Sequence, residues 1–379
     1  RDVGEEGALI IGQLWHPGRQ QLWHPTKTPI GVSNLPDPYS GTVPHVMDTK
    51  EVYRVAEAYI NTAKRLAYCG FDGVELHGAH GYLITQFLSA ASNIRDDEFG
   101  GDTVSRTLFI RNIAQGIKEA CGKNFIVGLK MPADEGVEGG VDPNEAEQIT
   151  GLLSATNNFD YFSYGQGNFS LSLENHVPDL YFREGHFIDL HKRMRAAANG
   201  VPVMALGRIG TAQLAEDVIE NGNGDLVGMS RALITDAALP QKAQLGDIKD
   251  IRPCVFDNFS WGEIHLGKPL TEHHNPYLGK KDEAFFRLKP AEFSKRVVVA
   301  GSGPAGLEAA WVAAARGHGV TLFCASPDLG GSLMTESALP GRSDMAQIIN
   351  HQIHLGNTYG VEYVLNHKVT RSDIAEYGA

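Results

Sequence analysis

The chain has 379 residues, of which 42% are hydrophobic and 21% charged, with 43 glycines and a formal net charge of −12. This length supports two domains with cores of their own, and the composition is that of a loop-rich α/β protein rather than a disordered or fibrous one. The acidic balance argues against a nucleic-acid-binding surface. Because the sequence contains no apolar run of membrane-spanning length and no signal-like first segment, we expect no membrane contact.

The cysteines give no sign of an oxidising location. Cys69, Cys121, Cys254 and Cys324 are scattered and form neither a disulfide framework nor a zinc pattern. We therefore expect a reducing, cytoplasmic setting. The first residue is not Met and the last residues stop within an α/β pattern, so we also expect both ends to be truncated.

Strand and helix patterns alternate through the first 230 residues. A strand over 8–15 precedes a Pro-rich loop to about residue 46, which holds an echo of one short motif (Gln13-Leu-Trp-His-Pro17 and Gln21-Leu-Trp-His-Pro25) that is too brief to be a repeat architecture. Asp48 or Thr49 then caps a helix. The next expected elements are strands at 71–77, 125–131, 161–164, 201–207 and 225–229, and helices at 105–120, 143–155, 188–198 and 211–221. This order predicts parallel βα units, two short of a (β/α)8 TIM barrel, with the deficit at the N-terminus.

The stretch 70–87 carries the strongest chemical signal. It reads as a buried strand that runs into a loop and a helix, and His77, His80 and Tyr82 follow one another within six residues at the strand exit. In a β/α barrel the C-terminal ends of the strands display the catalytic side chains. Two imidazoles and a phenol can donate hydrogen bonds to a substrate oxygen and deliver a proton. Three polar rings at one strand exit favour this interpretation over core or loop-capping roles.

A second α/β pattern begins near residue 290. Its fingerprint, Gly301-x-Gly303-x-x-Gly306, lies between a strand at 296–300 and a helix. Such glycines permit a tight turn and let phosphates approach the helix N-terminus. The next strand ends at Cys324, where an acidic residue would hold the ribose. Binding of the adenine ribose through other contacts, an impaired site, and a nucleotide fold kept for packing all stay open.

We therefore divide the chain into three parts. Residues 1–246 form the barrel, residues 247–290 a connector without α/β pattern, and residues 291–379 a partial Rossmann-like, dinucleotide-binding domain that is incomplete at its C-terminus.

These features resemble the old yellow enzyme family, in particular the long branch that includes 2,4-dienoyl-CoA reductase and trimethylamine dehydrogenase. In that branch an FMN-binding barrel is joined to an iron–sulfur loop and a nucleotide-binding region. The resemblance covers essentially the whole chain and implies two further N-terminal barrel strands. It rests on Gln13-Leu-Trp-His-Pro-Gly-Arg19, His77-Gly-Ala-His-Gly-Tyr-Leu83, Ser92-Asn-Ile-Arg-Asp-Asp-Glu-Phe-Gly-Gly101 with Arg106, Leu206-Gly-Arg208, Gly228-Met-Ser-Arg231 and Arg252-Pro-Cys254.

The resemblance implies a set of flavin contacts. Gln13 would hydrogen-bond the pyrimidine edge of the flavin. Lys130 stands where the family usually has Arg beside flavin N1 and O2, and a cation there would stabilise the anionic reduced flavin. The phosphate would lie between Gly207-Arg208 and Ser230-Arg231, at the ends of the last two barrel strands.

The resemblance also implies a reaction. His77 and His80 match the pair of donors that grips the oxygen of an activated alkene in the family's ene-reductases, and Tyr82 matches the proton donor. Hydride would pass from flavin N5 to the β-carbon, and Tyr82 would protonate the α-carbon while the histidines polarise the carbonyl. We therefore expect an FMN-dependent oxidoreductase that uses NAD(P)H to reduce an activated C=C bond.

The chain departs from the branch in the cluster loop. The four cysteine positions of the family's pattern fall on Cys254, Asp257, Trp261 and Glu272. One thiolate cannot hold a four-iron cluster, so we expect no iron–sulfur centre and no metal. The second domain would then be structural, or reductant would reach FMN directly. Whether FAD or another adenine nucleotide binds there is open.

Two other functions stay in view. Residues 181–186 look closer to trimethylamine dehydrogenase, which suggests an amine dehydrogenase or N-demethylase that passes electrons to an electron-transfer flavoprotein, although the amine-site Trp and Asp of that enzyme fall on Ser172 and Asn175. The missing cluster ligands and Cys324 suggest instead a non-catalytic subunit or scaffold. The expected partners are a small-molecule substrate and, by family habit, further copies of the chain.

Overall fold

The computed structural model describes residues 2–20, 27–280, 283 and 288–378. The second copy of the short motif, at 21–25, lies outside the described residues. The chain divides into two compact units. The first comprises residues 1–178, 185–207 and 216–228, and the second comprises residues 179–184, 208–215 and 229–379. We describe each unit by itself.

Within the described residues, the first unit is built on a parallel sheet of six strands in the order β1-β4-β5-β6-β7-β8. Neighbours in this sheet follow one another along the chain, apart from a short strand pair in the loop after β1, so the sequence-based expectation of parallel βα units is confirmed. The strands are β1 (Ile11–Leu14), β2 (Ile30–Gly31), β3 (His45–Val46), β4 (Gly73–His77), β5 (Ile126–Met131), β6 (Tyr161–Tyr164), β7 (Val203–Leu206) and β8 (Leu226–Gly228).

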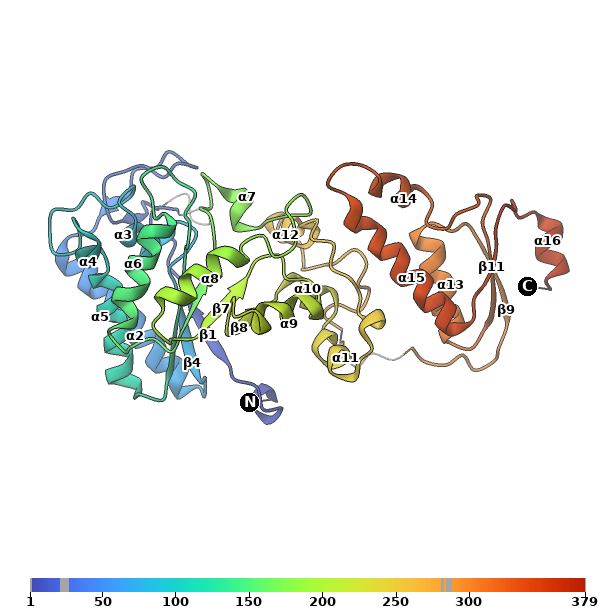
Figure 1. Ribbon diagram of the computed structural model, residues 1–379, viewed down its shortest axis with the longest axis horizontal. Coiled ribbons are helices and arrows are strands. Elements are labelled where there is room, and N and C mark those ends of the chain that lie inside the picture. The colour runs from blue at the N-terminus through green and yellow to red at the C-terminus, as the bar shows by residue number, and fades with distance from the viewer. Residues whose placement is uncertain (1, 21–26, 281–282, 284–287, 379) are drawn as a thin grey trace. The chain divides into compact units, whose positions relative to one another are not determined.

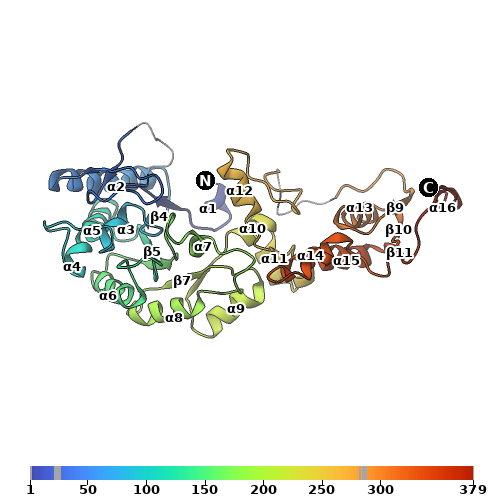
Figure 2. The same ribbon diagram turned by 90° about the horizontal axis from the view of Figure 1, so that it is seen from above.

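Four long helices form an arc along the outer side of this sheet, as Figures 1 and 2 show. They are α2 (Thr49–Tyr68), α5 (Leu108–Cys121), α6 (Pro143–Ser154) and α8 (Ile188–Ala197). The shorter helices are α1 (Asp2–Glu5), α3 (Leu83–Leu88), α4 (Thr103–Arg106), α7 (Leu173–His176) and α9 (Ala212–Glu220), whose first four residues belong to the second unit.

Helix α2 shows why these sequences fold as they do. Of the two cap candidates in the sequence, Asp48 and Thr49, Asp48 is the N-cap, and it forms a reciprocal capping box with Glu51, which satisfies two backbone donors at the helix start. Buried residues recur at helical spacing along one face, at Val52, Ala56, Tyr59 and Ala63. That face packs against α5 and the sheet and so belongs to the core of the unit.

The second unit contains the end of the barrel pattern, the connector and the Rossmann-like region. Among its described residues, β11-β10-β9 form a parallel three-stranded sheet, and α13 and α15 pack against each other beside it. Its elements are α10 (Arg231–Thr235), α11 (Leu239–Leu245), α12 (Phe259–His265), β9 (Arg296–Ala300), α13 (Pro304–Ala315), β10 (Gly319–Phe323), α14 (Ser332–Ser337), α15 (Ala346–Tyr359), β11 (Glu362–Val364) and α16 (Arg371–Glu376), with 3-10 turns at Ile248–Asp250 and Ser343–Met345. None of the helices in the described ranges of either unit is long and apolar enough to cross a membrane.

Candidate functional site

The site is organised by the turn that leads from β4 into α3. His77 is the last residue of β4, and the amide of Gly78 donates a hydrogen bond to the carbonyl of Lys130 on the neighbouring strand, at 2.6 Å. His80 has a left-handed backbone, with φ of +64°, which is uncommon for a residue with a side chain. The backbone amide of Phe169 donates to the carbonyl of His80 (3.1 Å) and holds this turn in place.

The turn brings the three sequence-predicted rings together. The ring centroids of His77 lie 5.1 Å from His80 and 5.2 Å from Tyr82, and those of His80 and Tyr82 lie 6.4 Å apart. His77 and His80 are 8% and 5% exposed. Two buried imidazoles and a half-buried phenol therefore share one small volume at the C-terminal end of β4.

The surroundings fix the protonation of these groups. Burial lowers the pKa of His77 to about 3, helped by the nearby charge of Lys130, and burial also lowers the pKa of His80 well below its usual value. The amide of Ala79 points at Nδ1 of His77 (3.4 Å), which leaves the ring proton on Nε2. Burial raises the pKa of Tyr82 to about 12, so the phenol keeps its proton. Neutral imidazole donors and a phenol proton suit an oxygen on which negative charge develops.

Aromatic residues that the sequence did not reveal line this site. The ring of His176 stacks on His80 with centroids 3.6 Å apart, and the rings of Trp15 and Phe169 lie 5.3 and 6.3 Å from Tyr82. Gly165 is also part of the wall, because a Cβ there would lie 2.7 Å from Nε2 of His80 and 3.2 Å from Cε of Lys130. His176 ends the short helix α7, and Phe169 and Gly165 lie in the loop between β6 and α7, whose sequence has no periodic pattern that would place these side chains.

Gln13 and Lys130 lie on the strands on either side of β4. Gln13 is exposed, and its Nε2 donates to Oε1 of Glu75 at 2.6 Å, while the hydroxyl of Tyr161 donates to Oε2 of the same carboxylate at 3.0 Å. Lys130 pairs in register with His77. The sequence analysis did not identify Glu75 as a site residue. It lies two residues before His77 on the same strand, and side chains two residues apart on a strand point to the same face of the sheet.

The two predicted phosphate-binding arginines converge on one ring in the second unit. The guanidinium carbons of Arg208 and Arg231 lie 4.8 and 4.6 Å from the ring centroid of Phe256. Arg208 is 2% exposed and pairs with Asp344 at 2.5 Å, whereas its buried Nε has no hydrogen-bond partner among the described residues. A second arginine beside Arg208 and the orphaned N–H of Arg208 fit a phosphate group, which would accept a hydrogen bond from that Nε.

The other predicted phosphate contacts are the residues next to these arginines. Gly207 directly follows β7 and has a φ of +104°, and Ser230 stands between β8 and α10. Each of them therefore lies at the C-terminal end of a strand, where barrel phosphate sites are commonly formed.

The dinucleotide fingerprint has its expected backbone. Gly301 has a φ of +106°, Gly303 caps α13, and a Cβ on Gly306 would collide with the carbonyl oxygen of Gly301, so close packing requires a glycine there. At the end of β10, the buried Cys324 has its Sγ 2.8 Å from Oγ of Ser302. A thiol–hydroxyl contact thus stands where the fingerprint would place a carboxylate.

The connector does not fit an iron–sulfur cluster. Cys254, Asp257, Trp261 and Glu272, the four positions of the cluster pattern, all line one cavity of about 20 Å³. A space of that size holds about one water molecule or ion, and a single thiolate cannot ligate four irons. These four positions therefore supply neither the thiolates nor, in this structure, the space that a four-iron cluster needs.

Both parts of the chain match known protein families. The model of the NADH:flavin oxidoreductase / NADH oxidase family matches residues 1–249, and that of an NAD(P)-binding Rossmann-like domain matches residues 299–364. The NADH oxidase of Thermoanaerobacter brockii is 35% identical over 345 residues, which cover 90% of this chain and 52% of that protein. The chain spans about half the length of the curated relatives it matches.

Two solved structures share the fold over nearly the whole chain. A 2-naphthoyl-CoA reductase in complex with 2-naphthoyl-CoA has a TM-score of 0.91 at 27% identity, and covers 99% of this chain and 59% of its own. The histamine dehydrogenase of Rhizobium sp. 4-9 has a TM-score of 0.89 at 29% identity, and covers 98% and 55%.

The lowered pKa of His77 predicts a dependence of stability on pH. Since the folded-state pKa is about 3 and the ordinary value is 6.5, the unfolded chain binds a proton between these values that the folded chain does not. The free energy of unfolding should therefore be constant above about pH 6.5 and fall below it. We expect urea midpoints to drop between pH 7.5 and pH 5, and to drop less steeply in His77→Gln. Equal slopes for the two proteins would contradict this assignment.

Proposed function

The chain belongs to the NADH:flavin oxidoreductase / NADH oxidase family, and we propose that it is an FMN-dependent reductase of activated C=C bonds that takes its electrons from NAD(P)H. The observation that carries this proposal is the group of neutral His77, neutral His80 and protonated Tyr82 at the exit of β4. Neutral imidazoles can donate to the carbonyl oxygen of an enone without attracting a competing anion.

The proposal gives each predicted site residue a role. FMN, when bound, supplies the hydride chemistry. Gln13 and Lys130 would hold the flavin edge, and Gly207-Arg208 with Ser230-Arg231 would hold its phosphate. The aromatic wall of Trp15 and Phe169 would exclude water from the substrate.

The proton-handling groups act on the substrate. His77 donates through Nε2 to the carbonyl oxygen, and His80 supplies the second donor, so negative charge that develops on that oxygen is stabilised. Tyr82 transfers its phenol proton to the α-carbon. A phenol whose pKa is raised to about 12 is a weak acid, and it can serve because the substrate carbon becomes strongly basic as the oxygen gains charge.

We also propose how the rest of the chain takes part. The fingerprint glycines Gly301, Gly303 and Gly306 would accept FAD or another adenine nucleotide, with Cys324 in place of a ribose-binding carboxylate. No iron–sulfur cluster would relay electrons, since the connector does not fit one. We keep the domain limits 1–246, 247–290 and 291–379, a small-molecule substrate, a cytoplasmic location and a homo-oligomer as parts of the proposal.

One second function has specific support. The structural likeness to histamine dehydrogenase favours an amine dehydrogenase or N-demethylase that passes electrons to a partner flavoprotein. The charge of Lys130, which already acts on both His77 and His80, argues against a cationic amine at this position, because like charges repel in a buried site.

An anaerobic titration followed by flavin absorbance tests the proposal. We expect NADPH or NADH to bleach the flavin of the purified protein, and an enone to restore its colour in proportion to the enone added. Trimethylamine and dimethylglycine should leave the oxidised flavin unchanged. Bleaching by an amine, without reoxidation by the enone, would support the second function and reject the first.

Gly165→Ala gives a geometric test of the site. Because the added Cβ would lie 2.7 Å from Nε2 of His80, the ring must move, and we expect enone-dependent reoxidation to slow by about tenfold or more. Gly151→Ala is the matched control, since its Cβ would meet only the carbonyl of Ala197 at 4.0 Å. Flavin content and urea midpoint should stay near those of the parent protein in both variants. An unchanged rate in Gly165→Ala would show that His80 does not need its present position.

A further inference from the structure

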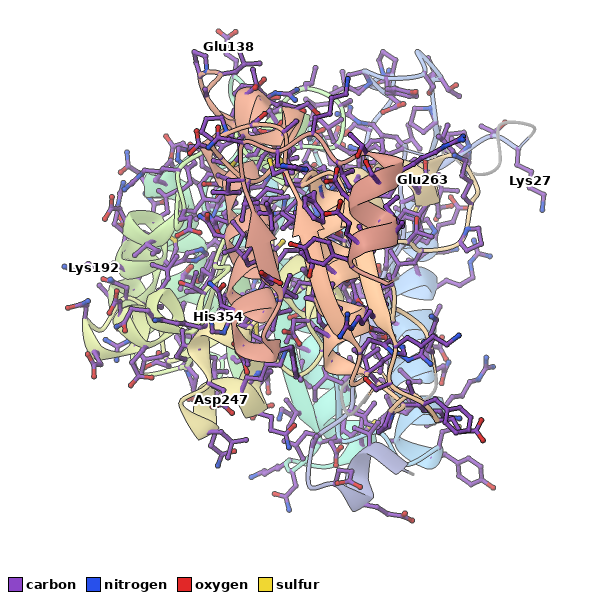
Figure 3. The ribbon with its side chains drawn as sticks, turned by 90° about the vertical axis from the view of Figure 1, so that its right-hand side faces the viewer. Lys27, Glu138, Lys192, Asp247, Glu263 and His354 are labelled. Atoms are coloured by element: carbon purple, nitrogen blue, oxygen red, sulfur yellow. The ribbon has the colours of Figure 1, made fainter. Side chains whose placement is uncertain are left out.

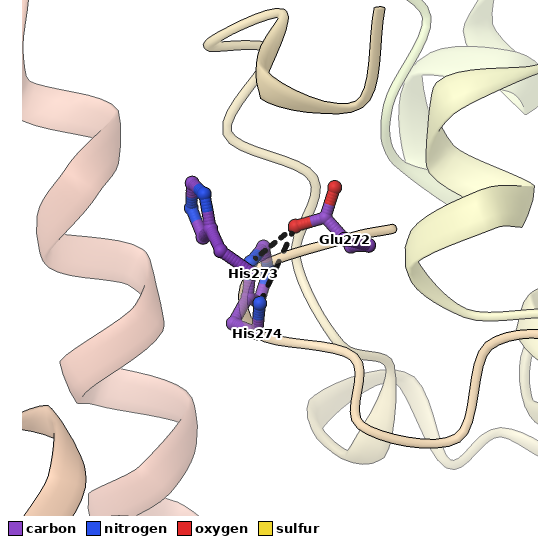
Figure 4. A group of neighbouring side chains, drawn as sticks. All are labelled: Glu272, His273 and His274. Atoms are coloured by element: carbon purple, nitrogen blue, oxygen red, sulfur yellow. Dashed lines mark hydrogen bonds and ion pairs between the residues drawn. The ribbon is translucent and has the colours of Figure 1, made fainter. Parts of the chain in front are cut away.

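The connector ends in a compact group of possible metal ligands that the proposed reaction does not use. Glu272, His273 and His274 follow one another directly before Asn275, and each offers a ligand atom within 4.8 Å of the other two (Figure 4). The side chains of Glu272 and His274 are 8% and 7% exposed. A carboxylate and an imidazole buried to this degree need either each other or a bound ion.

The hydrogen bonds of His274 orient it as a ligand. Its Nε2 lies 2.7 Å from the carbonyl oxygen of Pro253, and because a carbonyl can only accept, Nε2 carries the proton. In the neutral ring, Nδ1 then keeps its lone pair. This Nδ1 lies 2.7 Å from Oε1 of Glu272, yet the pair is not aligned as a hydrogen bond. Metal-bound histidines usually donate their other N–H to a carbonyl in this way.

The neighbouring side chains complete the arrangement. Oγ of Ser260 donates to Oε2 of Glu272 at 3.0 Å, which leaves Oε1 directed at His274. Nε2 of His273 lies 3.1 Å from Oδ2 of Asp257, a carboxylate–histidine contact that fixes ring orientation in many metal sites. Bonds of about 2.1 Å to one tetrahedral ion would space the ligand atoms by roughly 3.4 Å. Binding would therefore widen the 2.7 Å separation of His274 Nδ1 and Glu272 Oε1 and draw the partly exposed His273, now within 4.8 Å, toward the ion.

We propose that Glu272, His273 and His274 bind one divalent first-row transition ion, of the zinc or cobalt type, which cross-links the connector at the place where the family's pattern puts a cluster. Two imidazoles and a carboxylate are ligands that suit such an ion, whereas iron–sulfide clusters require thiolates. The ion has a structural role and takes no part in electron transfer. This site is independent of the proposed reductase activity.

Metal binding to the purified, flavin-containing protein tests the proposal. After removal of adventitious metal with EDTA and dialysis, we expect calorimetric titration with Zn²⁺ to show one saturable site per chain. Co²⁺ should give visible absorption bands of a coordinated ion at the same stoichiometry. Glu272→Gln and His274→Gln should each weaken Zn²⁺ binding by about tenfold or more, because each removes a direct ligand.

Two further variants keep the test decisive. Glu263→Gln, in the same connector on α12 (Figure 3), is the matched control, since the half-buried carboxylate of Glu263 accepts a hydrogen bond from Lys268 at 2.9 Å and is not one of the proposed ligands. It should bind Zn²⁺ like the parent protein. Should a ligand variant fail to fold by circular dichroism, Asp257→Asn replaces it, with weaker Zn²⁺ binding expected because the support of His273 is lost.

Three outcomes would overturn the proposal. They are the absence of saturable Zn²⁺ binding, Zn²⁺ binding of equal strength in the parent, Glu272→Gln and His274→Gln proteins, and iron with acid-labile sulfide in the protein as purified. The last would show a cluster where we propose a single ion.

Discussion

The burial of two imidazoles at the exit of β4 is the constraint on which the candidate site depends. Burial makes the charged form of each ring costly, so His77 and His80 stay neutral and act as hydrogen-bond donors rather than as cations. The left-handed backbone of His80 directs its ring back toward His77 and Tyr82, and such a strained conformation persists only where the surroundings hold it. The contacts of Phe169 with the turn and of His176 with the ring of His80 provide that support.

Burial also affects polar groups at two other places, near Phe256 and in the connector. The guanidinium groups of Arg208 and Arg231 lie 4.8 and 4.6 Å from the Phe256 ring centroid, and two like charges this close favour an anion. In the connector, Glu272 and His274 are buried together and oriented by Ser260 and the carbonyl of Pro253. In each arrangement one buried nitrogen, Nε of Arg208 or Nδ1 of His274, has no hydrogen-bond partner among the described residues, so each favours a bound ligand.

Periodicity and capping predicted most of the first unit. The strand at 161–164 and a helix cap at Asp48, one of the two predicted candidates, match the structure closely, because strand alternation and an N-cap carboxylate are local properties of the sequence. The helix in the connector was harder to predict from the sequence. The N-cap residue of α12, Asn258, has an αL backbone and makes no side-chain cap hydrogen bond, so the usual start signal is missing. In the Rossmann-like region the sequence analysis predicted elements only as far as β10. It did not predict α15 or β11, although α15 packs against α13.

The sequence predicted only part of the candidate site, because only some of its residues are close together along the chain. His77, His80 and Tyr82 stand within six residues of one strand exit, so the sequence could group them. Phe169 and Gly165 in the loop after β6, and His176 at the end of α7, reach the same place only in the folded chain, because this segment has no periodic pattern. The sequence showed Glu272 only as a residue that stands where the cluster pattern has a cysteine. Its contact with His274 depends on the orientation of the His274 ring, which no sequence pattern specifies.

The measurement that tests the central claim most directly is the rate at which an enone reoxidises the reduced flavin in Tyr82→Phe, followed by stopped-flow absorbance. General acids typically contribute about 10²–10⁴-fold, so the account predicts a fall of at least about a hundredfold, with reduction by NADPH retained. Tyr68→Phe, at a residue that is 93% exposed, should react like the parent protein. A Tyr82→Phe protein that reoxidises at the parental rate would contradict the role of Tyr82 as the proton donor.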